Sequence, residues 1–359
     1  MTRVKLDSKP GTVTLPRQDF LSRLELVEPA LSDNSALPIL SNIVFNKTSV
    51  LAYNDLIAIE VPFDTGIVGA VDGKLLINLL KASRAKTVDL LVDDGCLTIK
   101  AATAKLKLPV LDEKSFVFKM PEPRGASRIL FVEKIAGPVE HCLRSISKDA
   151  AIVEQSGVTM VFDKQGIGLY STNAQSLSLA NVNMTGNTDL RIALPAPFCK
   201  QLLGLAIDGA KLHVCKDYVL MTAGNAKLFS RLILVDQGKE INYQKVIDSN
   251  IPKGMKPALR PKTLDLVVKR AEVVAGKEGR TTITVEHGKM KFYTASGGGE
   301  VVDYLEADKA QPDVAISVQP RYLADTNDFK FMTVINSCVI FADDNNRNIY
   351  MAASSSVKS

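Results

Sequence analysis

The feature that most constrains this chain is a two-part pattern that occurs three times. A helix-like segment with apolar residues spaced near 3.6 precedes short β-branched segments, and a second helix and further strands follow. In a chain of 359 residues the period is about 120 residues. The first helices are expected over residues 17–31, 133–146 and 263–275, and the second helices over 72–82, 196–205 and 320–329. Turn formers separate the strands at hairpin spacing, which predicts antiparallel pairing.

The repeat predicts an α+β fold made of three similar domains. Boundaries are expected at the Pro-containing segment 121–124 and in the stretch 249–262, which is rich in Pro, Gly and Lys. The three domains are then 1–122, 123–250 and 251–359, with disorder from about residue 353 in a Ser-rich tail. A chance alternation of helices and strands in an α+β chain is the alternative.

The cysteine content and the hydrophobic segments indicate the cellular compartment in which the protein is expected. The five Cys residues form no Cys-x-x-Cys motif, which indicates reduced thiols. The N-terminal residues lack the apolar core of a signal peptide, and no apolar run approaches the roughly 20 residues of a membrane helix. A cytoplasmic protein that contacts no membrane is therefore expected. The net charge of +5 is too small to indicate nucleic acid by itself.

Sequence motifs for catalysis, metals and cofactors are absent. The chain has no Gly-x-Ser-x-Gly and no His-Glu-x-x-His motif. Residues 69–75 differ from a phosphate-binding loop, because Leu75 stands where Ser or Thr must bind magnesium. The acidic clusters at 93–94 and 343–346 are typical of turns, with a hard cation as the alternative. No catalytic residue, metal or cofactor is predicted.

Basic residues gather on or beside the expected helices. The segment 253–280 holds eight basic and three acidic residues, so its excess of five equals that of the whole chain. Bases aligned along one surface would attract a phosphate backbone without reading its sequence. Ordinary solvated helix faces are the alternative explanation.

Three segments point to a known family. Residues 36–45 read Ala-Leu-Pro-Ile-Leu-Ser-Asn-Ile-Val-Phe, residues 169–177 read Leu-Tyr-Ser-Thr-Asn-Ala-Gln-Ser-Leu, and residues 234–247 follow the second repeat. In order and spacing they resemble the opening signature, the Ala-Thr-Asp-Gly-His-Arg-Leu segment and the end of the second domain in the bacterial DNA polymerase III β subunit (sliding clamp) family. The three-unit layout covers essentially the whole chain.

The departures indicate a divergent member of that family, and a phage origin is one alternative. The family's Gly-His-Arg is Ala174, Gln175 and Ser176 here, and the Pro before its Asp-Tyr is Ile241. Its Met-Pro-Met ending is replaced by Met-Ala-Ala at 351–353, and an N-terminal extension of about ten residues precedes the first strand.

The resemblance implies a head-to-tail homodimeric ring, with helices lining a central hole and antiparallel sheets outside. Such a ring is a processivity factor: it encircles double-stranded DNA without sequence preference and tethers the replicative polymerase, which needs no catalysis. On this basis the residues expected to face DNA are Lys74, Arg144, Lys148, Lys269 and Arg270. The dimer interface is expected at Leu106, Leu108, Val273 and Val274.

The resemblance also implies partners that insert short hydrophobic peptides between the second and third domains, namely DNA polymerase and the clamp loader. The matching wall positions are Thr172, Leu177, Ile241, Val246, Ile349 and Met351. Two alternatives remain open from the residues alone. They are a monomeric nucleic-acid-binding regulator and an enzyme with a site between α+β domains.

Overall fold

A computed structural model describes residues 12–32, 37–112, 116, 118–148, 152–184, 189–235, 240–335, 337–344 and 347–356. The expected N-terminal extension lies outside the described residues, as do residues 36 and 236–239 of two family-like segments and residues 345–346 of an acidic cluster. The chain forms two compact units, one of residues 1–136 and 200–232 and the other of residues 137–199 and 233–359. The boundaries of the three repeated domains stay a prediction.

The first unit contains two antiparallel sheets. The smaller has the order β1-β6-β7-β8, formed by Val13–Pro16, Thr87–Asp93, Cys96–Ala101 and Ala104–Pro109. The larger has the order β5-β2-β3-β4-β16-β15-β14-β9, formed by Val68–Asp72, Asn42–Asn46, Ser49–Tyr53, Ile57–Pro62, Ala226–Arg231, Tyr218–Ala223, Lys211–Val214 and Arg128–Phe131. The helices of the first unit are α1 (Arg17–Val27) and α2 (Gly73–Ala82), with short 3-10 turns at Glu28–Ala30 and Pro38–Ser41.

Local sequence explains the start and the buried face of α2. Asp72 caps the helix, because its carboxylate accepts a hydrogen bond of 2.8 Å from the backbone N–H of Leu75. Leu76, Ile77 and Leu80 then recur at helical spacing and are fully buried. The apolar stripe therefore fixes which side of α2 packs on the sheets.

The segment that follows β8 covers part of the larger sheet. Phe116 is buried against this sheet's apolar side chains, and Phe118 packs there as well. The Phe118 ring stacks on Tyr53 with 4.1 Å between ring centroids. The connection between the first two repeats is thus a packed part of the fold.

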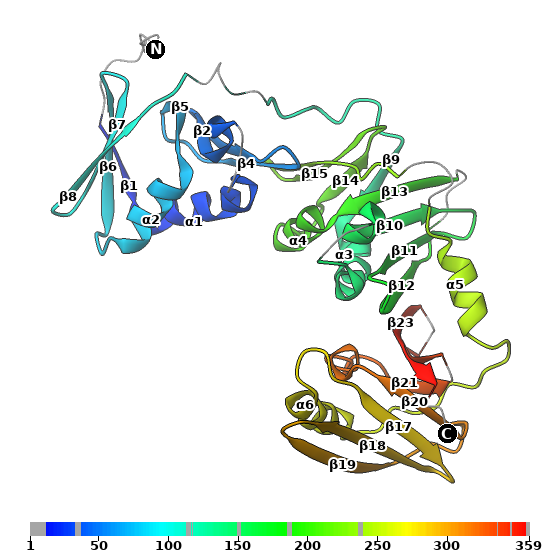
Figure 1. Ribbon diagram of the computed structural model, residues 1–359. Coiled ribbons are helices and arrows are strands. Elements are labelled where there is room, and N and C mark those ends of the chain that lie inside the picture. The colour runs from blue at the N-terminus through cyan, green and yellow to red at the C-terminus, as the bar shows by residue number, and fades with distance from the viewer. Residues whose placement is uncertain are drawn as a thin grey trace. The chain divides into compact units, whose positions relative to one another are not determined.

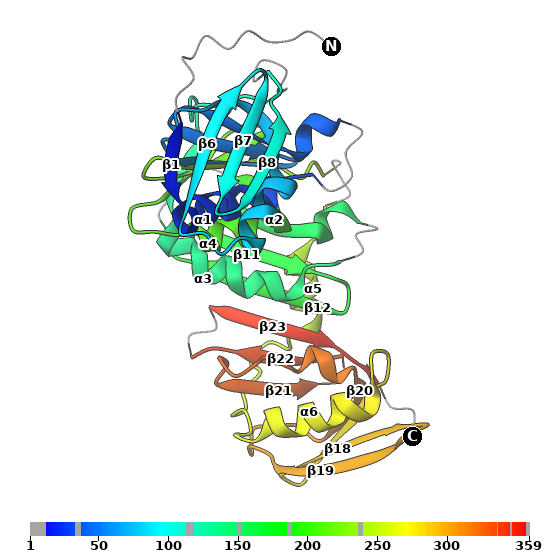
Figure 2. The same cartoon turned by 90° about the vertical axis from the view of Figure 1, so that its left-hand side faces the viewer.

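The second unit contains the other two antiparallel sheets. One has the order β13-β10-β11-β12-β23-β22-β21, formed by Leu190–Pro195, Gly157–Phe162, Ile167–Thr172, Ser176–Val182, Asn348–Ala353, Cys338–Ala342 and Phe331–Ile335. The other has the order β19-β18-β17-β20-β24, formed by Gly299–Glu306, Lys289–Ser296, Thr281–Glu286, Val314–Val318 and Ser355–Ser356. Figure 2 shows β12 and β23, from distant parts of the chain, side by side in the seven-stranded sheet.

The helices of this unit are α5 (Tyr243–Asn250) and α6 (Leu264–Ala275), with 3-10 turns at Leu143–Ser145, Val153–Ser156 and Pro320–Tyr322. Two more helices, α3 (Val132–Cys142) and α4 (Ala196–Gly204), have residues in both units. Helix α6 lies across the five-stranded sheet and contacts β18 and β19 (Figure 1). Leu264, Val267 and Val268 of α6 pack with Phe292 in the core beneath it.

The structure confirms most of the predicted secondary structure. All six predicted hairpins pair antiparallel, and five of the six predicted helices form, as α1, α2, α3, α4 and α6. The helix expected over 320–329 is wrong. Only Pro320–Tyr322 makes a 3-10 turn, because Asp325 has a left-handed φ of 53° and the Thr326 hydroxyl donates a hydrogen bond to the Leu323 carbonyl.

Two further expectations concern the chain end and membranes. Disorder from about residue 353 is wrong for residues 353–356, because β23 extends to Ala353 and Ser355–Ser356 pair with β20 as β24. Residues 357–359 lie outside the described residues. Among the helices that the structure describes, none is long and apolar enough to cross a membrane.

Candidate functional site

An apolar cluster lies where β12 meets β23. In the register of this pair Leu177 stands opposite Met351, and Leu179 stands opposite Ile349. Leu177 and Met351 are 5% and 4% exposed, and they pack in one cluster with the half-buried side chains of Ile241 and Ile349. Helix α5, which lies beside this seam in Figure 1, adds Tyr243 and Ile247 to the cluster. The structure therefore brings together four of the six predicted wall residues.

The other two predicted wall residues lie at the margin of this cluster. Thr172 stands opposite Leu177 in the β11–β12 hairpin, and its hydroxyl donates a hydrogen bond of 2.7 Å to the Ser176 carbonyl. That contact shapes the turn, whose tip residue Ala174 has a φ of 66°. Val246 lies on α5 with 38% of its surface exposed. Thr172 thus supports the hairpin turn beside the cluster, and Val246 offers an exposed apolar side chain outside it.

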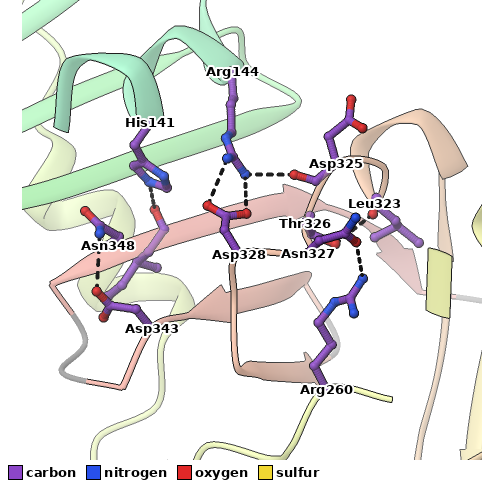
Figure 3. Close-up of polar contacts among 11 residues, drawn as sticks. His141, Arg144, Arg260, Leu323, Asp325, Thr326, Asn327, Asp328, Asp343 and Asn348 are labelled. Atoms are coloured by element: carbon purple, nitrogen blue, oxygen red, sulfur yellow. Dashed lines mark hydrogen bonds and ion pairs between the residues drawn. The ribbon is translucent and has the colours of Figure 1, made fainter. Parts of the chain in front are cut away.

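The opposite side of the same seam is polar and contains Arg144. Its guanidinium donates two hydrogen bonds to the Asp328 carboxylate, of 3.0 and 2.9 Å, and one of 2.9 Å to the Asp325 carbonyl (Figure 3). The guanidinium carbon also lies 5.4 Å from the centroid of the Phe329 ring. Arg144 therefore joins the segment after α3 to the turn before β21, and Asp328 compensates its charge.

His141 makes a second link on this side. Its Nε2 lies 3.1 Å from the Ile349 carbonyl oxygen, a contact drawn as the dashed line at His141 in Figure 3. The His141 ring packs edge-on against the Phe329 ring, with 5.5 Å between the centroids. Burial lowers the pKa of His141 from its usual 6.5, and the nearby Arg144 charge acts in the same direction. The Ile349 carbonyl, Asp328 and Asp343 oppose this shift without cancelling it.

This lowered pKa predicts a pH-dependent part of the stability. The folded state disfavours imidazolium, so the contribution is complete above the unfolded pKa of about 6.5 and is lost as pH falls from there through the folded pKa. We expect His141→Gln to flatten the fall in Tm between about pH 7.5 and pH 5, measured by scanning calorimetry. His287→Asn, at an exposed turn position with a φ of 48°, is the control and should keep the wild-type slope. A His141→Gln slope equal to that of the wild type contradicts the prediction.

A hollow of about 510 Å³ lies on this polar side. Its lining contains the bases Arg144, Lys148 and Arg321 and a single acid, Asp325. Lys148 is exposed, and Arg321 reaches Glu278 only at 3.9 Å. The lining therefore contains more bases than acids, and it includes two of the five predicted DNA-facing residues.

The remaining basic candidates lie on two helices. Lys269 and Arg270 are exposed on α6, and Arg270 makes hydrogen bonds of 3.0 and 2.7 Å with the Asp303 carboxylate of β19. Lys269 is exposed, so its ammonium group is accessible to solvent. Lys74 is half-buried in the first turn of α2, in the first unit. Of the five predicted DNA-facing residues, Arg144 and Arg270 thus form ion pairs, Lys148 and Lys269 are exposed, and Lys74 is half-buried.

The predicted dimer-interface residues lie on or near free sheet edges. Strand β8, with Leu106 and Leu108, ends one sheet of the first unit, and β19 ends the five-stranded sheet. Leu108 is only 2% exposed and packs within its own unit, and Leu106 is half-buried. On α6, Val273 is 85% exposed and Val274 is half-buried. Val273 is therefore the most exposed apolar side chain among the four predicted interface residues.

Sequence reasoning missed several polar residues around the seam. Asp328, which compensates Arg144, was expected within a helix and had no assigned role. Glu154 is 1% exposed and accepts a hydrogen bond from the backbone N–H of Ile241, and its only sequence signal is an acid directly after the apolar stretch 151–153. In the described part of the chain, no three His, Cys, Asp or Glu side chains gather as a metal site requires.

Comparison with solved structures identifies the fold. No protein-family model matches the chain. The β subunit of DNA polymerase III from Thermotoga maritima is 17% identical with a TM-score of 0.82, and the match covers 97% of this chain and 100% of that chain. Sliding clamps bound to griselimycin match over the same shares, at 20% identity and a TM-score of 0.81 for Bartonella birtlesii and at 15% and 0.82 for Pseudomonas aeruginosa. Over nearly its whole length, the chain therefore has the fold of the bacterial DNA polymerase III β subunit, the sliding clamp.

Proposed function

We propose that this protein is a DNA sliding clamp, a processivity factor that encircles duplex DNA as a ring of two copies and tethers the replicative polymerase. The observation that carries the proposal is the match in fold to bacterial sliding clamps over 96–97% of the chain and 99–100% of the chains compared. A match over the full length supports a shared architecture of the whole protein. A clamp acts by enclosure, so the proposal includes no catalytic step and no cofactor.

The surfaces described above support the individual parts of this function. Exposed bases at Lys148 and Lys269 provide the sequence-independent attraction to phosphates that an encircling protein needs. The free edges of β8 and β19, with the exposed Val273, fit a head-to-tail contact in a closed ring. The apolar cluster at the β12–β23 seam, with the exposed Val246 nearby on α5, supports a partner groove at this place, which would take short hydrophobic peptides of the polymerase and the clamp loader.

Topological linkage is the property that tests this function. We expect dimers assembled in the presence of a nicked circular plasmid to stay with that plasmid during gel filtration in high salt. Cutting the plasmid once should release them, because a ring slides off a free end. Equal persistence on circular and linear DNA would support the monomeric regulator instead, and a solution mass of 38.9 kDa would exclude the ring.

The same assay tests the basic surfaces. The double variant Lys148→Glu/Lys269→Glu should stay dimeric but lose about tenfold in plasmid retention near 0.15 M salt, because each phosphate contact adds a salt-sensitive part of the affinity. The matched control is Lys164→Glu/Lys216→Glu, in which both bases lie in exposed turns between strands. If both double variants are retained equally well, Lys148 and Lys269 do not face DNA.

A further inference from the structure

A buried carboxylate lies next to Ile241, one of the wall residues of the proposed partner groove. Glu154 precedes β10 and is 1% exposed. Its Oε1 accepts hydrogen bonds from Arg191 of β13 and from the Thr159 hydroxyl, the latter of 3.0 Å. Its Oε2 accepts one of 2.9 Å from the backbone N–H of Ile241. Both oxygens therefore have partners, as a charge withdrawn from water requires.

Arg191 binds the backbone carbonyl of Ile241, the residue whose N–H is bound by Glu154. Its Nη2 donates a hydrogen bond of 3.0 Å to the Ile241 carbonyl, and its guanidinium carbon lies 5.4 Å from the centroid of the Tyr243 ring. The ion pair thus binds the N–H and the C=O of Ile241 at once. These bonds leave side-chain contact as the main way in which Ile241 can meet a ligand.

The residues held by this network form the wall itself. Ile241 packs in the apolar cluster with Leu177 and Met351. Two residues further on, Tyr243 begins α5, stacks on Tyr170 with 4.9 Å between centroids, and has its hydroxyl 3.3 Å from that of Thr159. The network therefore sets both the depth of Ile241 and the starting point of α5 against the sheet.

The Glu154–Arg191 ion pair contributes more to the position of Ile241 than to the stability of the fold. Glu154 is buried and the Arg191 side chain is 27% exposed, and taking the carboxylate out of water offsets much of the attraction between them, so the pair adds little net stability compared with apolar side chains. Its hydrogen bonds, however, are directional and fix one geometry. The family that the sequence resembles has Pro where this chain has Ile241, and Pro has no N–H. The N–H that Ile brings needs a buried acceptor, which Glu154 supplies.

We propose that the Glu154–Arg191 ion pair is the positioning element of the partner groove, which it serves by fixing Ile241 and the start of α5. This inference rests on the peptide-binding role proposed above. Glu154 and Arg191 themselves lie behind the wall and act through Ile241. A purely structural pair would instead stabilise the fold without a specific link to the Ile241 side chain.

A double-mutant cycle on peptide affinity separates these two roles. Glu154→Gln keeps the shape but turns an NH₂ donor toward either the Ile241 N–H or the Arg191–Thr159 pair of donors, so the wall shifts. The probe is a fluorescein-labelled polymerase C-terminal peptide with one Leu and one Phe anchor, measured by anisotropy. We expect its Kd to rise about tenfold on Glu154→Gln in the wild-type background and less than about twofold in the Ile241→Ala background.

Control variants decide the remaining outcomes. Asp344→Asn breaks a surface ion pair with Lys330 in the same unit and should leave the peptide Kd unchanged. Arg191→Lys retains the charge but lacks the fork that reaches Glu154 and the Ile241 carbonyl together, and it should show the same background dependence if Glu154→Gln folds poorly. Equal rises in both backgrounds, or no rise with folded Glu154→Gln, would overturn the inference.

The proposed function fails in a different way. If Met351→Asp leaves the peptide affinity unchanged, the seam is not the partner site, and the groove itself is rejected. If Met351→Asp abolishes binding while Glu154→Gln has no effect, the groove stands and only the positioning role is rejected.

Discussion

Val273→Asp is expected to convert the dimer into protomers. Light scattering should then give 38.9 kDa in place of about 78 kDa, twice the chain mass. Val273 is 85% exposed on α6, so the change leaves the fold of its own unit intact. In a closed ring this side chain would be covered by the neighbouring copy. Burying an unpaired carboxylate there costs several kcal/mol, which corresponds to a loss of at least about a hundredfold in dimer affinity.

One control variant and a second measurement make this result specific. Ile207→Asp changes an apolar side chain that is 56% exposed and outside the proposed interface, so it should stay dimeric. Leu108→Asp is a poorer test, because Leu108 is 2% exposed and its replacement would disturb the core of its own unit. The plasmid assay should follow the mass, with Val273→Asp lost from circular DNA. A Val273→Asp dimer of about 78 kDa would contradict the proposed interface.

Local sequence patterns predicted most helices because the capping residue and the buried apolar face of such a helix lie within its own short segment. In α2 the capping Asp72 and the buried Leu76, Ile77 and Leu80 lie within one short stretch. Helix α5 was not predicted, since its eight residues bury only Tyr243 and Ile247. Its start depends on the Asn242 cap and on the distant network around Glu154. An element held by remote contacts carries a weak local signal.

The helix predicted over 320–329 does not form, although its local sequence carries a helical signal. The apolar spacing there agrees with a helix, but the Asp-Thr-Asn-Asp sequence at 325–328 favours local turns. In the structure this turn presents the Asp325 carbonyl and the Asp328 carboxylate to Arg144. A continuous helix would not place both groups there, so a long-range contact accompanies the irregular backbone.

The candidate site could be predicted only as far as the family resemblance reached. It led to four residues that meet in one cluster, including Leu177 and Met351. It did not reveal the partners of the charged residues. Arg144 and Asp328 are 184 positions apart, and Glu154 and Arg191 are 37 apart, so neither pair leaves a periodic trace in the sequence. Pairing across the β12–β23 seam brings two repeats together, which no single repeat encodes.

Met351→Asp is expected to abolish peptide binding at the seam groove. Met351 is 4% exposed and stands opposite Leu177, and an unbranched thioether suits a wall that must adapt to different ligands. Two apolar anchors contribute about 3–6 kcal/mol when they are buried. A carboxylate at position 351 requires hydration and excludes those anchors, so the Kd of the labelled polymerase peptide should rise more than about a hundredfold.

Because Met351 is buried, the test needs a variant that leaves the core intact. Val246 is 38% exposed on α5 and outside the cluster, so Val246→Asp should fold normally and weaken the same peptide about tenfold by placing a charge at the groove margin. Leu259→Asp, at a side chain that is 52% exposed away from the groove, is the matched control and should bind as the wild type does. Circular dichroism and the dimer mass check folding in each case. If Val246→Asp and a folded Met351→Asp both bind like Leu259→Asp, the partner site lies elsewhere, because a charge in the wall or at the margin of an occupied groove would oppose the burial of an apolar anchor.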